Sequence, residues 1–361
     1  MKKFKVLGLM SGTSLDGLDL AYCHLWQTNS NAWDFKILKA KTISYSQEWK
    51  SKLKNAISLS ETAHEMLDLE YGKWLGIQAK NFIQTHNLVI DFIASHGHTS
   101  HHRPEDSYTF QLGNGQELAN ASNQKVVCDF RSLDVKLGGQ GAPLVPIGDE
   151  LLFNNYDFCL NLGGISNISF KKEGKRVAYD IGLANMPLNY ISKKIDLEYD
   201  NGGKLAASGK LDDKLYSQLN DLTYYKLPFP KSTGYEWFIK EIVSLIKSSS
   251  NSTQDLLHTF IHHNCQQIAI SVNANKEIEN NKILVCGGGA LNDFFIDVLT
   301  QKLSSSTKVI IPSKQLINFK EALVFGLMGV LKIRNEINVL SSVTGASKDS
   351  CSGVIFLPTS I

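Results

Sequence analysis

Several features are scarce in this 361-residue sequence, and each scarcity argues against a class of protein. No apolar run approaches the ~20 residues that a membrane-spanning helix needs. The apolar run behind the N-terminal Met-Lys-Lys breaks at Ser11 and Gly12, which is too short for a secretion signal. The 37 Lys and Arg residues nearly balance the 35 Asp and Glu residues, and no basic block is interleaved with aromatic residues. We therefore expect neither a membrane nor a nucleic acid as partner.

Cysteine pairs with metal-site or redox spacing are also absent, since no C-x-x-C occurs. The six cysteines are Cys23, Cys128, Cys159, Cys265, Cys286 and Cys351, mostly inside apolar runs. They are expected to be reduced core thiols of a cytoplasmic protein. With 43% hydrophobic and 20% charged residues, the composition is ordinary for a globular enzyme, and the length suffices for two domains or one large α/β unit.

The run from Gly8 to Asp19 is the most informative motif, and it predicts a tight polar turn between two strands. Gly12 and Gly17 permit positive φ, which would let backbone N–H groups converge on an anion. The turn also offers hydroxyl groups and carboxylates on Ser11, Thr13, Ser14, Asp16 and Asp19. Hydroxyl donors suit phosphate, and carboxylates suit magnesium or its water shell. No Walker motif occurs in the sequence, and an ordinary Gly/Ser/Asp hairpin would have the same composition, so both interpretations stay open.

The order of predicted elements repeats along the chain. Strand patterns cover 3–10, 17–26 and 34–45, a helical pattern covers 60–86, and a strand covers 88–95. A second set of strands at 158–162, 165–171 and 176–180 is followed by helical patterns at 184–197, 209–220, 233–250 and 253–278, a strand at 282–286, a helix from Leu291, a strand near Val309 and a helix over 320–335. Such a duplication predicts two α/β domains facing each other across a cleft. The Gly/Pro-rich run 138–146 is the natural boundary.

Two further glycine turns and one aspartate occur at corresponding places in the second half. Gly163-Gly164 follows the first strand of the second set, and Gly287-Gly288-Gly289 joins a strand to a helix. Both could admit a phosphate or a flat ring close to the backbone. Asp180 ends a predicted strand, where a carboxylate could orient and deprotonate an attacking oxygen. The alternative for Asp180 is a helix N-cap, and Gly-rich turns between a strand and a helix are common.

Two polar segments of the first half remain ambiguous from their residues alone. The run Ser95 to His102 holds four histidines, which would suit a zinc site, a sugar-binding or structural loop, or a solvated surface. No C-x-x-C or H-E-x-x-H pattern accompanies them. Arg131 follows another predicted strand and could form a bidentate pair with a ligand carboxylate, or an internal ion pair with Asp129 or Asp134.

With these residues laid out, the sequence closely resembles the anhydro-N-acetylmuramic acid kinase family over essentially its full length. The resemblance rests on the runs 8–17, 95–99, 129–131, 138–146 and 161–167, on Asp180 with Gly182 and Asn185, and on the runs 206–209, 286–289 and 321–322. It implies an α/β, duplicated actin-like (ribonuclease H-like) ATPase fold with two domains around a central cleft. The domains would be 1–144, completed by 335–361, and 145–334.

The resemblance also implies a reaction: ATP, with Mg²⁺, phosphorylates O6 of 1,6-anhydro-N-acetylmuramic acid while water opens the ring at C1. Asp180 would activate that water. The ATP phosphates would bind Gly12, Thr13, Ser14, Leu15, Asp16, Gly17, Leu18, Asp19, Gly163 and Gly164, and the adenosine side would lie near Gly287, Gly288 and Gly289. Thr99, Arg131 and Glu321 would bind the sugar. No direct metal motif is present, so Mg²⁺ would come with ATP, with Asp16 as a candidate ligand, and the protein would be a homodimer.

The sequence departs from the family's pattern beside the proposed base. The usual Asp-Thr-Gly-Pro-Gly-Asn is Asp-Ile-Gly-Leu-Ala-Asn here, with Ile181, Leu183 and Ala184 as the changed residues. We expect kinase chemistry to be kept, because Asp180 and the predicted phosphate turns are present. We expect any difference to lie in the sugar specificity. The competing hypotheses are a kinase of the same fold for another anhydrosugar or hexose derivative, and a non-catalytic ATP-binding switch.

Overall fold

The computed structural model describes residues 2–12, 14–277 and 279–359. They form two compact units, Met1–Leu152 with Phe319–Ile361, and Phe153–Asn318. The chain passes between the units at 152/153 and 318/319, where the sequence analysis expects 144/145 and 334/335. The first unit includes this additional chain because Gly148 packs directly on Val324 and Asp149 forms a buried ion pair with Lys320 at 2.6 Å.

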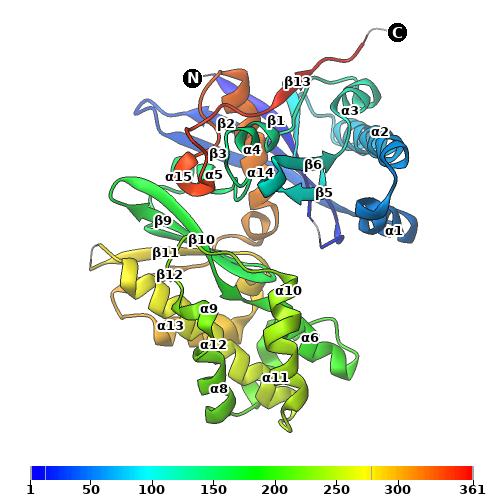
Figure 1. The fold of residues 1–361 in the computed structure, drawn as a ribbon. Helices are drawn as coiled ribbons and strands as arrows, with labels where there is room; N and C mark the ends of the chain where they lie inside the picture. Colours follow the sequence, from blue (N-terminus) through cyan, green and yellow to red (C-terminus); the bar gives the residue numbers. More distant parts are fainter. Residues whose placement is uncertain (1, 13, 278, 360–361) are drawn as a thin grey trace. The chain divides into compact units, whose positions relative to one another are not determined.

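The first unit is a six-stranded sheet with helices on both faces (Figure 1). Its strands are β1 (Lys3–Ser11), β2 (Gly17–Gln27), β3 (Trp33–Ser44), β4 (Phe92–Ser95), β7 (Val126–Cys128) and β13 (Val354–Phe356), with a separate hairpin of β5 (His98–Arg103) and β6 (Tyr108–Leu112). Its helices are α1 (Gln47–Asn55), α2 (Glu61–Thr85), α3 (Gly115–Ser122), α4 (Ser132–Lys136), α5 (Pro146–Leu151), α14 (Lys314–Ile333) and α15 (Ser341–Thr344).

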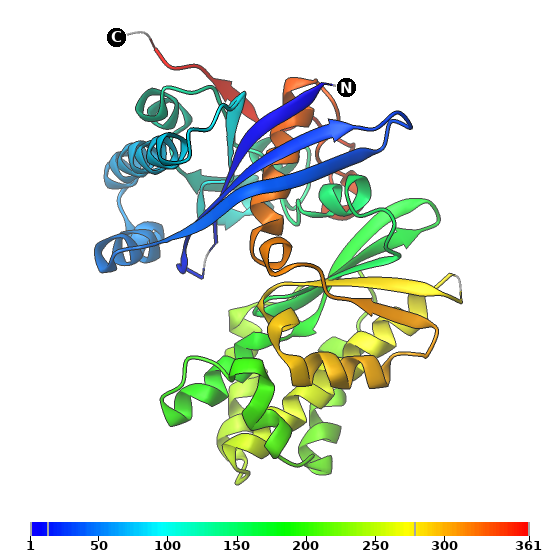
Figure 2. The same ribbon diagram turned by 180° about the vertical axis from the view of Figure 1, so that it is seen from behind.

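Strand alternation explains how this sheet is covered. Leu7 and Leu9 of β1 join one buried cluster with α2 and α3. The alternate residue Gly8 faces α14, where a side chain would overlap the Ala322 carbonyl oxygen. Figure 2 shows α14 beside the long strands β1 and β2. The glycine therefore brings β1 and α14 into close contact just before the polar turn that follows β1.

The second unit is a five-stranded sheet covered by helices. Its strands are β8 (Phe158–Leu162), β9 (Ile165–Lys172), β10 (Lys175–Leu183), β11 (Asn281–Cys286) and β12 (Thr307–Ile310). Its helices are α6 (Asn185–Ser192), α7 (Lys204–Ser208), α8 (Asp213–Asn220), α9 (Thr223–Lys226), α10 (Tyr235–Trp237), the π-helical η5 (Phe238–Ile242), α11 (Val243–Ser248), α12 (Thr253–Asn275), the 3-10 turn η6 (Gly288–Leu291) and α13 (Asp293–Lys302). A continuous apolar core joins the sheet to α12, whose buried residues occur along its whole length.

The two sheets have the same strand order, which confirms the predicted duplication. The orders are β3-β2-β1-β4-β7, with β13 added at the edge, and β10-β9-β8-β11-β12. In each unit the first three strands are antiparallel. The next two run parallel to the first strand. This is the repeated α/β arrangement of the duplicated, actin-like fold that the sequence predicts.

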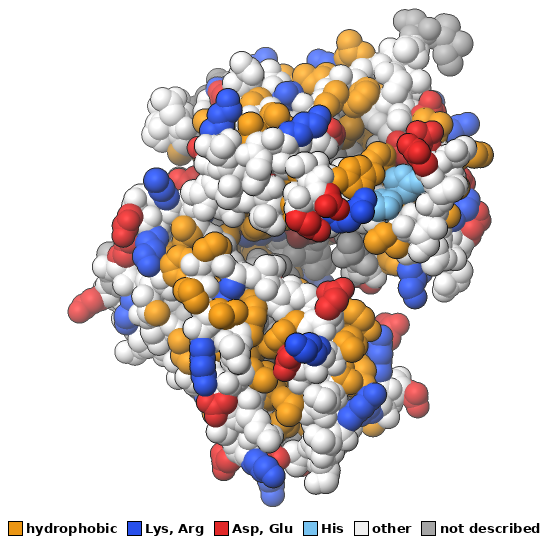
Figure 3. Space-filling view, viewed as in Figure 1, with side chains coloured by type: hydrophobic (Ala, Val, Ile, Leu, Met, Phe, Trp, Pro, Cys, Tyr) orange, Lys and Arg blue, Asp and Glu red, His pale blue; other side chains and the backbone are white. Residues whose placement is uncertain are grey.

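Three general expectations can be compared with the described residues. All six cysteines are free thiols, and five of them are buried. No helix in the described part of the chain combines the length and the hydropathy of a membrane span. On the face that Figure 3 shows, Lys and Arg side chains alternate with Asp and Glu side chains and uncharged surface.

Candidate active site

The predicted phosphate turn is the connection between β1 and β2. The Leu15 N–H donates to the Gly12 carbonyl at 3.3 Å, and Leu15 has φ 60°. Neither Gly12 nor Gly17 has the positive φ that the sequence analysis allowed; Gly17 is needed because a Cβ would lie 2.5 Å from the Ile43 carbonyl oxygen. Among the described residues of the turn, Leu15 is therefore the one that adopts the left-handed conformation. Thr13 lies outside the described residues.

Side chains in this turn divide into exposed polar and buried apolar groups. Ser14 and Asp16 are exposed, so their oxygen atoms are accessible to a ligand. Leu18 is buried in the core, and Leu15 packs against the same cluster. Asp19 accepts a hydrogen bond from Thr42. Its pKa is raised by burial, lowered in part by the Thr42 hydroxyl, and raised by Asp16.

Glycine positions reveal where the fold leaves open backbone without needing it for its own packing. Of the 27 glycines, most either have positive φ or would place a Cβ against neighbouring atoms. The exceptions, where a Cβ would meet only ordinary contacts or the end of a flexible side chain, are Gly12, Gly163, Gly164, Gly234, Gly288 and Gly326. Four of these six lie in the three predicted nucleotide turns. The fold itself has room for a side chain at these four positions, so its own packing does not require glycine there.

The turn between β8 and β9 is held from one side by the start of α6. Asn185 donates from its side chain to the carbonyls of Leu162 and Gly163, both at 2.8 Å. The Gly163 carbonyl also accepts from the Asn185 N–H, and the Gly164 carbonyl accepts from Ala184 and Met186. The Gly163 carbonyl and the Gly164 N–H belong to the same peptide, and in a trans peptide the C=O and N–H point in opposite directions. The Gly164 N–H is therefore directed away from α6, as a donor to a phosphate would need.

The third glycine turn lies directly against the second. Gly287 has φ 80°, and a Cβ there would lie 2.6 Å from the Asn161 side-chain oxygen. A Cβ on Gly289 would lie 2.7 Å from Leu162, whereas one on Gly288 would meet nothing within 4 Å. Gly287 and Gly289 thus allow the two turns to pack, and Gly288 is open. The predicted helix does not start at Leu291: a 3-10 turn intervenes, and α13 begins at Asp293 with Asn292 as its N-cap.

Asp180 lies within β10, at an irregularity, and not at the strand end that the sequence predicts. The register with β9 shifts between Asp180 and Gly182, which is the signature of a β-bulge, a feature that redirects side chains. Ile181, the residue between them, is buried in the core. The N-cap alternative is wrong, because α6 starts at Asn185 with Ala184 as its N-cap residue.

The carboxylate of Asp180 is bound by a segment that the sequence analysis did not single out. The Ser232 hydroxyl donates to Oδ2 at 2.9 Å, and the Thr233 N–H donates to the same atom at 3.1 Å. Tyr224 donates its phenol to the Asp180 main-chain carbonyl at 2.7 Å. Burial raises the pKa of Asp180, and the Thr233 and Ser232 hydrogen bonds lower it in part. The run Lys231-Ser-Thr-Gly234 gives no signal beyond a polar loop, so only the fold identifies it.

The predicted sugar-side residues of the first unit form an electrostatic group. Arg131 is half-buried and donates to His96 Nε2 and to the Gly141 carbonyl. Burial lowers the pKa of Arg131 to about 10, against the opposing effects of Glu321 and Asp134. Glu321 is an exposed residue; desolvation by the surrounding protein raises its pKa, while Arg131 lowers it and Asp19 raises it. Glu321 therefore interacts electrostatically with both Arg131 and Asp19.

His96 must be neutral in this arrangement. Arg131 only donates, so His96 Nε2 accepts, and the ring proton lies on Nδ1, which contacts the Gly97 carbonyl at 2.9 Å. Burial, followed by the Arg131 charge, lowers the pKa of His96 well below its usual value. Thr99 lies in β5 at a second strand irregularity. The structure thus makes His96 the partner of Arg131, a contact that the sequence analysis did not predict.

The four histidines of 95–102 have four separate partners, which argues against the zinc interpretation. His98 contacts Ser11 Oγ at 3.1 Å, while His101 contacts Ser100 and His102 contacts Thr109. Within the described residues no group of three or more potential metal ligands converges. The Ser11 hydroxyl also bonds the Tyr45 phenol at 2.7 Å. His98 and Tyr45 therefore anchor the residue that precedes the first glycine turn.

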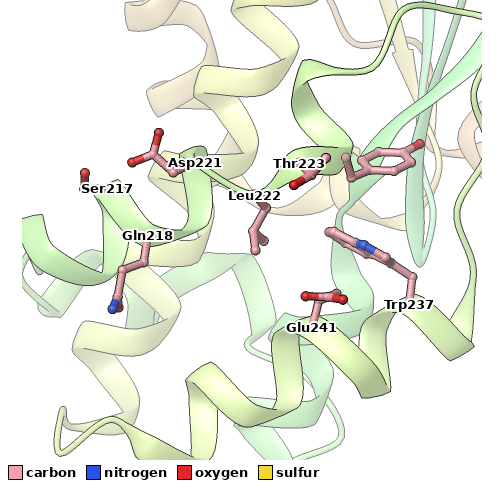
Figure 4. Close-up of a pocket in the computed structure, with 8 residues that line it drawn as sticks. Ser217, Gln218, Asp221, Leu222, Thr223, Trp237 and Glu241 are labelled. Carbon is pink, nitrogen blue, oxygen red and sulfur yellow. The ribbon is translucent and has the colours of Figure 1, made fainter.

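A separate cavity of about 440 Å³ lies beside α8 and α9 (Figure 4). It is lined by Ser217, Gln218, Asp221, Leu222, Thr223, Tyr224, Trp237 and Glu241. None of the predicted site residues lines it. Its carboxylates without any lining Lys or Arg do not suit a phosphate. Tyr224, which lines the cavity, also donates to the Asp180 carbonyl.

Comparison with known proteins agrees with the resemblance seen in the sequence. Residues 4–358 match the family described as anhydro-N-acetylmuramic acid kinase. A protein of that name from Sulfurimonas denitrificans is 33% identical, with 97% of this chain and 98% of the relative aligned. Another from Francisella tularensis subsp. novicida is 32% identical over 96% and 97% of the two chains. Among solved structures, component A of (R)-2-hydroxyglutaryl-CoA dehydratase from Acidaminococcus fermentans matches with a TM-score of 0.46 at 10% identity, covering 90% of this chain and 96% of that one. The chain therefore belongs to the anhydro-N-acetylmuramic acid kinase family, a family of phosphotransferases with an alcohol group as acceptor.

Proposed function

We propose that the protein is an ATP-dependent kinase that phosphorylates 1,6-anhydro-N-acetylmuramic acid at O6 and opens its anhydro ring with water. The product would be N-acetylmuramic acid 6-phosphate, and the reaction would serve the reuse of cell-wall material. Family membership supports the sugar. The observation that carries the nucleotide part is the set of open glycines, Gly12, Gly163, Gly164 and Gly288, in three turns where the fold has room for a side chain.

The proposed ATP-binding residues fit the chemistry of a triphosphate. Backbone N–H groups of the 12–19 turn and of Gly163-Gly164 would bind phosphate oxygens, with Ser14 adding a hydroxyl. Gly288 would let adenosine approach the strand-to-helix turn. Asp16 is exposed and lies close enough to Asp19 to raise its pKa. This pair of carboxylates suits a hydrated Mg²⁺ bound to the nucleotide, which would neutralise the developing charge on the phosphates.

In the proposed reaction, Asp180 removes a proton from a water molecule as the water oxygen bonds to C1 of the sugar. The C1–O6 bond breaks, O6 bonds to the γ-phosphorus, and the bond to the ADP oxygen breaks. The proton on Asp180 then passes to solvent. A half-buried carboxylate with a raised pKa is suited to this role, because a general base works best when its pKa approaches the working pH. Arg131, Glu321 and Thr99 are proposed to bind the sugar, with His96 holding the Arg131 guanidinium.

The proposal also includes a cytoplasmic location, where ATP is available, and a homodimer. Both follow from family resemblance. The notable chain-specific difference is Ile181, whose side chain is buried in the core. Ile181 offers no hydroxyl group to Asp180, and the hydrogen bonds to the Asp180 carboxylate come from the 231–233 segment.

The decisive test measures ADP release with ATP and Mg²⁺ while the acceptor is varied. We expect ADP release only with 1,6-anhydro-N-acetylmuramic acid, and not with glucose, N-acetylglucosamine or a 1,6-anhydrohexose without the lactyl group. Faster release with one of the other sugars would favour a kinase of the same fold for that sugar. ATP hydrolysis at the same rate with and without every sugar would favour an ATP-binding switch.

A further inference from the structure

The segment 231–233 binds Asp180 through three hydrogen bonds, although it lies about fifty residues further along the chain. The Asp180 N–H donates to the Lys231 carbonyl at 3.1 Å. The Ser232 hydroxyl and the Thr233 N–H then both donate to the carboxylate, at 2.9 and 3.1 Å. The main chain and the side chain of Asp180 are therefore bound by one short stretch of the same loop.

Both side-chain hydrogen bonds reach the same oxygen atom, Oδ2. The other oxygen, Oδ1, accepts no hydrogen bond in the described part of the chain, and it is not among the fully buried polar atoms without a partner. Rotation of the carboxylate by half a turn would exchange the two oxygens only after both hydrogen bonds break. The two atoms thus have different environments, although they are chemically identical.

We propose that Ser232 and the Thr233 N–H are positioning groups that bind Oδ2 and thereby assign proton removal to Oδ1. The inference rests on the proposed role of Asp180 as the base that activates water. A base must present a lone pair along a fixed direction within hydrogen-bond reach of the proton it removes, and fixed geometry lowers the entropy cost of reaching the transition state. Ser232 acts through Asp180 and does not itself exchange a proton.

The same two groups also affect the pKa of the carboxylate. Burial raises the pKa of Asp180, and the hydrogen bonds from Thr233 and Ser232 oppose this because they stabilise the anion. Three titratable side chains pack on this part of β10 in the described residues. Tyr224 donates its phenol to the Asp180 carbonyl, Lys231 donates its ammonium to the Tyr224 carbonyl at 3.2 Å, and the Tyr225 ring lies against Gly182. Removing the Ser232 hydroxyl is therefore expected to raise the pKa of Asp180.

The test compares Ser232→Ala and Ser232→Thr in the full-length protein by two independent readouts. The first is the titration of the Asp180 carboxyl carbon by NMR with ¹³C-labelled aspartate, assigned through Asp180→Asn. The second is the pH profile of kcat/KM. Ser232→Ala should raise the pKa of Asp180, move the acid limb of the profile to higher pH, lower kcat about tenfold for the loss of one charge-assisted hydrogen bond, and leave the KM for ATP unchanged. Ser232→Thr keeps the hydroxyl and should restore all three properties.

Ser248→Ala is the matched control, since Ser248 is an exposed serine of the same unit that donates only to the Leu245 carbonyl. It should leave the titration and the profile unchanged. The inference is overturned if Ser232→Ala, folded as judged by its thermal unfolding, has the wild-type Asp180 pKa and the wild-type acid limb. If the wild-type protein shows no sugar-dependent kinase activity, the proposed function fails, and the NMR titration alone still decides whether Ser232 controls Asp180.

Discussion

Substituting Gly164 by alanine tests whether a bound ligand or the packing of the fold requires glycine at this position. A Cβ at Gly164 would lie 3.7 and 3.9 Å from atoms of the Met186 side chain, which are ordinary contacts, and the backbone is not left-handed. The fold therefore has room for the methyl group. Folding stability should be unchanged or rise by about 0.4–1 kcal/mol, because alanine restricts the unfolded chain.

ATP binding should respond in the opposite direction. If phosphate oxygens lie against the Gly164 N–H, the methyl group displaces them and weakens one charge-assisted hydrogen bond, worth about 1.5–3 kcal/mol. At 1.4 kcal/mol for each factor of ten, the Kd for an ATP analogue should rise about 10- to 150-fold. Isothermal titration calorimetry with Mg²⁺ and a non-hydrolysable ATP analogue measures this, and thermal unfolding measures the stability of the same sample.

Gly287→Ala is the contrasting variant. Gly287 has φ 80°, and its Cβ would lie 2.6 Å from the Asn161 side-chain oxygen. Unfolding should therefore become easier by at least about 1–2 kcal/mol from backbone strain alone. The reasoning is refuted if Gly164→Ala binds the analogue as tightly as the wild type, or if it unfolds as easily as Gly287→Ala.

Three further predictions concern the base, a buried ion pair and acid stability. Asp180→Asn should bind ATP normally and lower turnover about 10²–10⁴-fold, the range for a positioned base; steady-state kinetics with near-normal turnover would remove Asp180 from that role. Asp149→Ala should destabilise the protein by about 3–5 kcal/mol, because it breaks the buried ion pair between Asp149 and Lys320. Denaturant unfolding that shows a change of less than about 1 kcal/mol would contradict the importance of the pair. Burial lowers the pKa of His98 to about 4 and that of His263 to about 3. Since the unfolded chain takes up these protons first, stability should fall as pH drops below about 6.5 and keep falling towards pH 4. His98→Gln should lose less stability than the wild type between pH 7 and 4.5, and equal losses would exclude His98 as a source.

The sequence predicted the repeated strand pattern because long alternating strands carry a strong local signal. Strands β1 to β3 and β8 to β10 begin and end close to the expected residues, and the duplicated order follows from them. The sequence pattern gives no bounds for any helix or strand in the stretch between His98 and Cys128. The structure has the hairpin β5–β6, the short helix α3 and the strand β7 there, and these elements are polar or brief. Strand β7 is defined by its pairing with β4 and β13, which lie far from it in the sequence.

The glycine turns of the candidate site were predictable from the local sequence, and its long-range contacts were not. The three turns could be recognised from Gly, Ser and Asp residues in sequence. The hydrogen bond from Ser232 to the Asp180 carboxylate joins residues 52 positions apart, and the pairing of His96 with Arg131 joins residues 35 positions apart. The bulge at Asp180 depends on how β10 pairs with β9. No local pattern encodes such contacts. Leu15, which adopts the left-handed conformation in the first turn, shows the same limit at short range, because glycine is the residue that sequence reasoning would choose there.

The most direct test of the proposed reaction is the mass of the product formed from ATP, Mg²⁺ and 1,6-anhydro-N-acetylmuramic acid in H₂¹⁸O. The account predicts that each product molecule gains one phosphoryl group and one water, with a single ¹⁸O at C1 and none in the phosphate. A product that gains phosphate without water, or carries no ¹⁸O at C1 in a rapidly quenched sample, would contradict the role of Asp180 as the base that activates water.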